Sequence, residues 1–203
     1  AVTTFEKKYK NAIPYKGSNH IQLLGNIEWK NEVLNIFNEL IKKSQLSDDE
    51  NQLVESIILE YSDDSNFEIQ LTNLINGEQS TNTTTLNSLK AMEIMDKFSP
   101  PIRSTIESKL FSDSLKVRNQ TISLLVKFPP SDKACEKLLE IANNKENASQ
   151  IRVMALEAIT KKTKSLSHED LRFLIEISKS KSNPSLGIQS ARAISNISLK
   201  VNE

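Results

Sequence analysis

Hydrophobic and polar residues follow a helical period along most of this chain. Apolar side chains recur three or four positions apart, as at Val33, Phe37 and Leu40, and no useful length shows the two-residue alternation of a strand. The pattern predicts ten helices, marked by apolar stripes at 29–41, 53–61, 67–75, 86–98, 102–110, 117–128, 134–141, 151–159, 171–178 and 186–197. We therefore expect an all-α fold.

Residues that begin and end helices stand between these stripes. Ser47 followed by Glu50 has the spacing of a capping box, in which each side chain bonds the other residue's backbone N–H. Ser131 and Asn183 stand where N-caps are expected, and Pro100 fits a first helical turn, where no intrahelical N–H bond is needed. The polar segment 78–84 is predicted as a turn, and residues 1–27, which lack a period, as an irregular lead-in.

Short sequence elements recur along the chain at intervals of 30 to 35 residues. The Phe-Pro junction at Phe98 recurs at Phe128, and the apolar-Arg pair ending at Arg118 recurs at Arg152, 34 residues later. A period of this length, made of two antiparallel helices, is typical of an α-solenoid, in which neighbouring units complete one another's core.

The segment 111–118 resembles the HEAT-repeat pattern, in which a turn acid, here Asp113, precedes a Val-Arg pair ending at Arg118. Asn147 and Arg152 look like the same element with Asn for Asp, and a third copy has Gly187 where the Arg would stand. The resemblance covers roughly 85–200. It implies a right-handed α-solenoid of antiparallel helix pairs. It also implies a structural ladder between neighbouring units, formed by Asp113, Arg118, Asn147 and Arg152.

The repeat motifs also divide the chain. Residues 85–203 carry them, whereas 28–84 look helical without a repeat motif and are expected to be degenerate units or an N-terminal cap. Because a solenoid unit buries its apolar face only against its neighbours, we expect both parts to pack as one continuous domain.

Composition removes several classes of active site. One cysteine, Cys135, excludes an internal disulfide, and two histidines, His20 and His168, exclude a three-histidine zinc site. HEAT-like deoxyhypusine hydroxylases hold two irons through several His-Glu dipeptides, whereas this chain has one, at His168. No glycine-rich phosphate loop or nucleophile elbow is present. We expect a non-enzymatic protein with no metal, no cofactor and no catalytic residue.

Charge is unevenly distributed although the 203 residues balance to zero. Residues 1–100 carry 9 basic and 15 acidic residues, a net charge of −6, and residues 101–203 carry 17 and 11, a net charge of +6. Either the halves complement each other as solvated helix faces, or the basic half binds an acidic partner. HEAT-like alkylpurine DNA glycosylases make nucleic acid an alternative, but residues 101–203 offer only Phe111, Phe128 and Phe173 for base stacking.

The function expected from this pattern is a scaffold or adaptor that binds a protein or peptide on the concave surface of the second helices. The candidate partner-binding positions there are Lys116, Asn119, Gln120, Ser123, Lys127, Gln150, Val153, Glu157, Lys161, Gln189, Arg192 and Ser195. The absence of any run of 18 apolar residues predicts no membrane span. A cytoplasmic location is favoured, and the removal of a signal peptide before Ala1 is left as an alternative. The sequence does not determine the oligomeric state.

Overall fold

The structure, a computed structural model, describes residues 27–78, 80–95, 97–180 and 182–197, with side chains described from Asn31 onward. Within these ranges the chain forms α-helices and short 3-10 helices and no strand, which confirms the expected all-α class. Of the predicted lead-in over 1–27, residues 1–26, with His20, lie outside the described residues, as does the side chain of Trp29. Ile27, predicted as part of that lead-in, begins the first described helix.

The described helices follow one another with short connections. They are α3 (Ile27–Ile41), α4 (Asp48–Tyr61), α5 (Ser65–Asn76), α6 (Asn82–Ala91), η1 (Met92–Ile94), α7 (Pro100–Ser108), η2 (Lys109–Phe111), α8 (Leu115–Leu125), α9 (Asp132–Asn143), α10 (Ser149–Thr160), α11 (His168–Ser178) and α12 (Pro184–Ser195).

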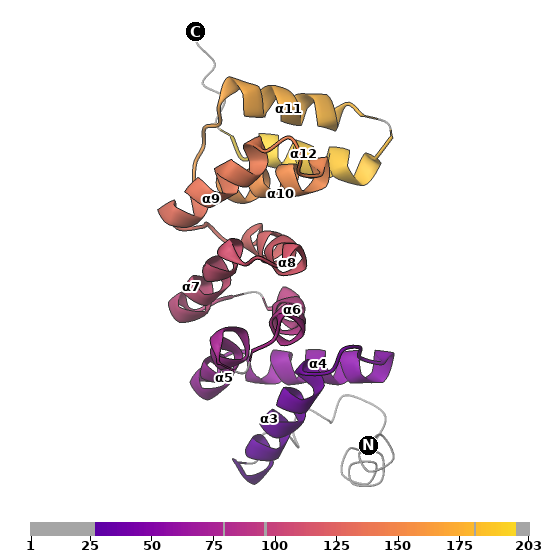
Figure 1. Ribbon diagram of the computed structural model, residues 1–203, viewed down its shortest axis with the longest axis vertical. Coiled ribbons are helices and arrows are strands. Elements are labelled where there is room, and N and C mark those ends of the chain that lie inside the picture. Colours follow the sequence, from indigo (N-terminus) through magenta and orange to yellow (C-terminus); the bar gives the residue numbers. More distant parts are fainter. Residues whose placement is uncertain (1–26, 79, 96, 181, 198–203) are drawn as a thin grey trace.

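The helices pile up along the long axis of the molecule, from α3 at one end to α11 and α12 at the other (Figure 1). Each of the pairs α5–α6, α7–α8, α9–α10 and α11–α12 packs together. The second members also contact one another in order, α6 to α8, α8 to α10 and α10 to α12, while α5 contacts α7. The apolar core therefore runs between two layers of helices along the length of the stack.

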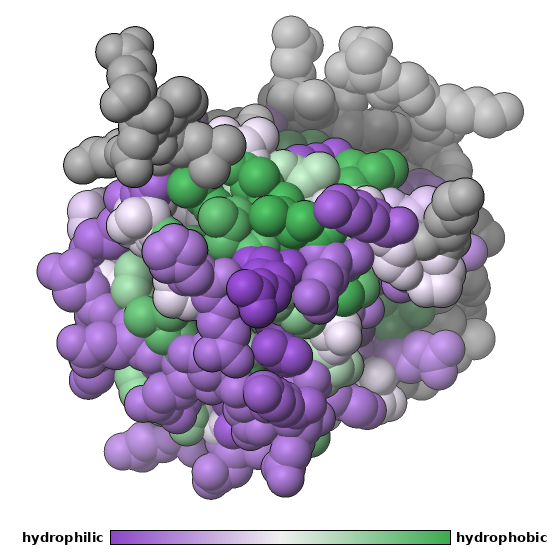
Figure 2. Space-filling view, turned by 90° about the horizontal axis from the view of Figure 1, so that it is seen from above, coloured by the Kyte–Doolittle hydropathy of each residue, from purple (hydrophilic) through white to green (hydrophobic). Residues whose placement is uncertain are grey.

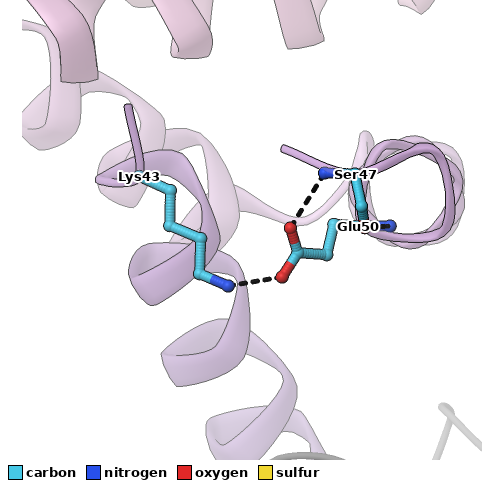
Figure 3. A network of polar contacts seen from close by, with 3 residues as sticks. All are labelled: Lys43, Ser47 and Glu50. Carbon is cyan, nitrogen blue, oxygen red and sulfur yellow. Dashed lines mark hydrogen bonds and ion pairs between the residues drawn. The ribbon is translucent and has the colours of Figure 1, made fainter. Parts of the chain in front are cut away.

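The capping box predicted at Ser47 is confirmed. The Ser47 amide donates to Glu50 Oε2 at 3.0 Å, and the Glu50 amide donates to Ser47 Oγ at 3.3 Å. Lys43, just beyond the end of α3, forms an ion pair with the same Glu50 carboxylate (Figure 3). Glu50 thus caps α4 and ties its first turn to the preceding helix.

Because Glu50 both caps α4 and pairs with Lys43, we expect the free energy of unfolding to fall measurably in acid. The hydrogen bond from Lys43, followed by the bond from the Ser47 amide, lowers the pKa of Glu50. Stabilisation from a lowered carboxyl pKa is complete above the unfolded value of about 4.3 and is lost as pH falls through the folded value. We expect Glu50→Ala to lower the free energy of unfolding by about 1 kcal/mol at neutral pH. The variant should lose less stability than the parent between neutral pH and about pH 3.

Urea unfolding at several pH values measures this effect, with Glu50→Gln as the matched control. Gln keeps an oxygen for the Ser47 amide but removes the charge, so it should retain part of the cap and lose the acid sensitivity. Equal pH slopes for the parent and both variants would contradict the role given to this carboxylate.

Aromatic rings mark two places where neighbouring helix pairs meet. Phe37 and Phe67 lie edge to face at 5.1 Å between ring centroids. Further along, the two recurring Phe-Pro junctions contact each other: the rings of Phe98 and Phe128 are 5.0 Å apart. Arg103 joins them, because its Nε donates to the Phe98 carbonyl at 3.0 Å and its guanidinium lies 5.2 Å from the Phe128 centroid. The two Phe-Pro junctions therefore pack against each other, and we call the contact of Phe98, Arg103 and Phe128 the seam.

Several predicted helix boundaries are wrong. Residues 82–84, predicted as part of a turn, begin α6, because Thr81 caps that helix by accepting from the Thr84 amide. Thr85, although polar, is buried, and its hydroxyl bonds the Ile75 carbonyl at 3.3 Å. The stripe at 86–98 leaves α-helical geometry after Ala91 and continues as η1 only to Ile94, so Met95 and Phe98 lie outside any helix. The stripe at 102–110 leaves α-helical geometry after Ser108 and ends in η2.

Candidate binding surfaces

The twelve predicted partner-binding positions fall into three groups. Lys116, Lys127, Gln150, Lys161, Arg192 and Ser195 are exposed, Asn119, Gln120, Ser123 and Gln189 are half-buried, and Val153 and Glu157 are buried. The prediction that the last two face a partner is therefore wrong. Helix α10 packs against α8, α9 and α12, so every residue from 153 to 160 is buried.

Three of these side chains have partners within the chain. Gln120 Nε2 donates to Glu93 Oε1 at 2.6 Å, Ser123 Oγ donates to the same oxygen at 3.2 Å, and Lys127 Nζ donates to the Glu93 carbonyl. Glu93 lies in η1, at the end of the preceding pair. The contacts thus hold α8 against η1, and they occupy groups that the concave-surface prediction assigned to a partner.

The predicted ladder residues form a different set of contacts. Asn147 Nδ2 donates to the Ile141 carbonyl at 2.9 Å and Arg152 Nε donates to the Ala142 carbonyl at 2.6 Å, so both bond to the end of α9. The Arg152 guanidinium also lies 4.0 Å from the Phe173 centroid in α11. Between Asp113, which is exposed, and Arg118 the structure places no ion pair. These units are therefore not linked by an acid–arginine ladder.

A groove opens between α7 and α9 on the layer of first helices. We call it the Phe111 groove; it encloses about 810 Å³ and is lined by Pro100, Arg103, Phe111, Pro129, Pro130 and Lys133, with further polar residues. Phe111 is 50% exposed, an unusual state for a phenylalanine and the main apolar feature of this surface.

Cations surround the Phe111 ring. Lys133 Nζ lies 5.2 Å and Lys137 Nζ 5.8 Å from its centroid, both from α9, and Arg103 stands on the α7 wall. The one acid among the lining residues, Glu107, accepts from the Ser131 amide at 2.8 Å and from the Ser131 hydroxyl. The groove therefore offers an apolar floor with cations on both walls, a surface suited to an apolar side chain flanked by carboxylates.

A second hollow of about 580 Å³ lies on the other side of α9, toward α11. Cys135 and Leu139 line it, and Lys162 and Asp132 close one side with an ion pair of 2.5 Å. Burial raises the pKa of the Cys135 thiol, with Lys162 acting in the opposite direction. A neutral thiol is a poor nucleophile, so this cysteine contributes packing rather than reactivity.

Helices α4 and α5 form the acidic part of the molecule. No lysine, arginine or histidine occurs between residues 44 and 89, whereas nine acidic residues do. Leu59, at 66% the most exposed of the large apolar side chains in the described ranges, lies near the end of α4. Glu55 lies four residues earlier on the same helix, and Asp63 lies four residues later in the turn that follows Tyr61. We call Glu55, Leu59 and Asp63 the acidic stripe; all three side chains are exposed.

Apolar side chains also reach the surface at the α11–α12 end. Figure 2 looks onto that end and shows a green apolar patch bordered by purple polar residues. Among the described residues of these two helices, Ile188 is exposed and Leu171 and Ile175 are half-buried.

In the described ranges, no three His, Cys, Asp or Glu side chains gather closely enough to hold a metal ion. A helix with the length and apolar character needed to cross a bilayer is likewise missing from the part of the chain that the structure describes. Comparison with protein-family models gives no match for this chain, and comparison with the curated proteins gives none either.

Proposed function

We propose that this chain is a non-enzymatic protein-binding scaffold built as a right-handed α-solenoid of HEAT-like helix pairs. The order of contacts supports this architecture, because second helices touch second helices along the stack. So does the seam, in which Phe98 and Phe128, 30 residues apart, meet at equivalent positions. The division into repeats over 85–203 and a degenerate N-terminal part over 28–84 belongs to this proposal.

The observation that carries the binding function is the Phe111 groove. A half-exposed phenylalanine in a groove that the exposed Pro100 and Pro129 also line, with cations on both walls, is an arrangement that buries apolar area when a partner docks. Its charge selects an acidic protein segment with an apolar side chain among its carboxylates. The concave surface stays a second proposed contact, through exposed positions such as Lys116, Gln150 and Lys161.

The contacts of the cations favour a protein over nucleic acid. Several basic side chains of the C-terminal half already have internal partners: Lys137 pairs with Glu140, Lys162 with Asp132, and Arg152 lies over Phe173. A duplex-binding surface needs several cations free to contact phosphates. Binding to duplex DNA at low salt with a steep salt dependence would contradict the scaffold proposal.

Selection from a displayed library of random peptides tests the groove. We expect enrichment of peptides that combine carboxylates with a Leu, Ile or Phe. Phe111→Ala should raise their dissociation constants at least about tenfold. Leu115→Ala is the matched control, since Leu115 is also an exposed large apolar side chain but does not line the groove. Peptides that bind Phe111→Ala as tightly as the parent would overturn the assignment.

A further inference from the structure

We propose that the Phe111 groove takes the acidic stripe, at the C-terminal end of α4 and the turn after it, of a second copy of this chain. This inference rests on the proposed function of the groove and names its partner. Both surfaces lie within the described residues of the same molecule, at separate places in the stack (Figure 1). Their residues match in charge and in apolar content.

The stripe has the chemistry that the groove selects. Leu59 projects an apolar side chain from α4, and Glu55 lies one helical turn, about 6 Å, before it on the same helix. Asp63 follows in the turn after the helix end at Tyr61. No cation anywhere from residue 44 to 89 weakens the negative potential of this part of the chain. Neither Glu55 nor Asp63 has a hydrogen-bond or ion-pair partner among the described residues, so both are available to a docking cation.

The apolar and charged side chains of the groove match those of the stripe. Leu59 on Phe111 would remove from water two of the largest exposed apolar side chains of the described ranges. The carboxylates would meet Lys133 on one wall and Arg103 on the other, with Lys137 close to the Phe111 ring just outside the groove. Both lysines lie over the face of Phe111, a weak contact at an exposed site, and Lys137 also pairs with Glu140 at 2.6 Å. That pair is exposed and joins residues three apart on α9, so a docking carboxylate can replace it at little cost.

The overall charge permits the association. The whole chain carries no net charge, so two copies do not repel each other at long range, while their oppositely charged parts attract. Each copy carries one stripe and one groove. Reciprocal docking would give a closed dimer, and one-sided docking an open head-to-tail chain. The measured mass separates these two forms.

Sedimentation equilibrium of the full chain tests the proposal, at about 20 mM and about 300 mM salt. We expect self-association that weakens at the higher salt. A stripe variant, Glu55→Lys with Asp63→Lys, and a groove variant, Lys133→Glu with Lys137→Glu, should each raise the dissociation constant at least about tenfold. Mixed together they should form hetero-oligomers, because the reversed charges again face opposite ones.

Two controls separate docking from general charge effects. Glu32→Lys with Glu39→Lys makes the same charge change on exposed positions of α3 and should leave the association unchanged. Leu59→Ser should weaken it, whereas Ile69→Ser, which changes a similarly exposed apolar residue of α5, should not.

A monomeric parent at both salt concentrations overturns the second copy as the partner. If selected acidic peptides still bind the groove and Phe111→Ala abolishes that binding, the occupant is a segment of another protein and the scaffold proposal stands. If neither association nor Phe111-dependent peptide binding is found, both proposals fail. Variants that abolish association singly but fail to restore it when mixed would also overturn the pairing of stripe and groove.

Discussion

Phe128→Ala should lower the free energy of unfolding by about 3–5 kcal/mol. The Phe128 side chain is 4% exposed, and its ring meets Phe98 at 5.0 Å and the Arg103 guanidinium at 5.2 Å. Truncation removes the buried ring and leaves a cavity between two helix pairs.

Urea unfolding followed by circular dichroism measures this loss. Phe111→Ala is the matched control, because it deletes the same ring from a half-exposed site and should cost less than about 1 kcal/mol. The double variant Phe98→Ala with Phe128→Ala should lose less than the sum of the two single variants, since the second truncation no longer breaks the ring contact. Equal losses for Phe111→Ala and Phe128→Ala would mean that the seam does not hold the stack together.

Glu157→Leu should raise the free energy of unfolding by about 1–3 kcal/mol. Glu157 is 3% exposed, and its Oε2 is buried without a hydrogen-bond partner. Its neighbours along α10, such as Val153 and Leu156, are buried apolar residues. A buried polar oxygen without a partner costs free energy that a leucine of similar volume does not.

Thermal and urea unfolding of the purified variant check this gain, with Glu176→Leu as the control. Glu176 is exposed on α11, so its replacement should change stability by less than about 0.5 kcal/mol. A Glu157→Leu variant that is less stable than the parent would show that the carboxylate has a stabilising partner, such as an internal water.

Local signals in the sequence were enough to predict much of the helical framework. Caps need only a few adjacent residues, so Ser47, Ser131 and Asn183 were predicted as N-caps and do accept the expected amides. The start of α6 was missed because Thr84 and Thr85 are polar yet buried, and only their contacts across the structure reveal why.

The surfaces depended on longer-range packing and were predicted less well. Helical spacing placed Val153 and Glu157 on a face of their helix that was expected to be exposed. That helix packs against α8 and α12, and both side chains are buried. Contacts with other helices cannot be read from the apolar pattern of one helix. The Phe111 groove arises from the separation of α7 and α9 over Pro129 and Pro130. In the sequence, Phe111 directly follows the apolar stripe at 102–110, and nothing in the local pattern distinguishes a half-exposed phenylalanine from a buried one.

The order of helix contacts affects how the chain folds while it is being synthesised. Extensive contacts join helices that are close in sequence, such as α5 with α6, α8 with α10 and α11 with α12. Each described helix from α5 onward can therefore pack soon after it leaves the ribosome, against helices made shortly before or after it. Such local topology favours rapid folding in step with translation, with little apolar surface left uncovered on the way.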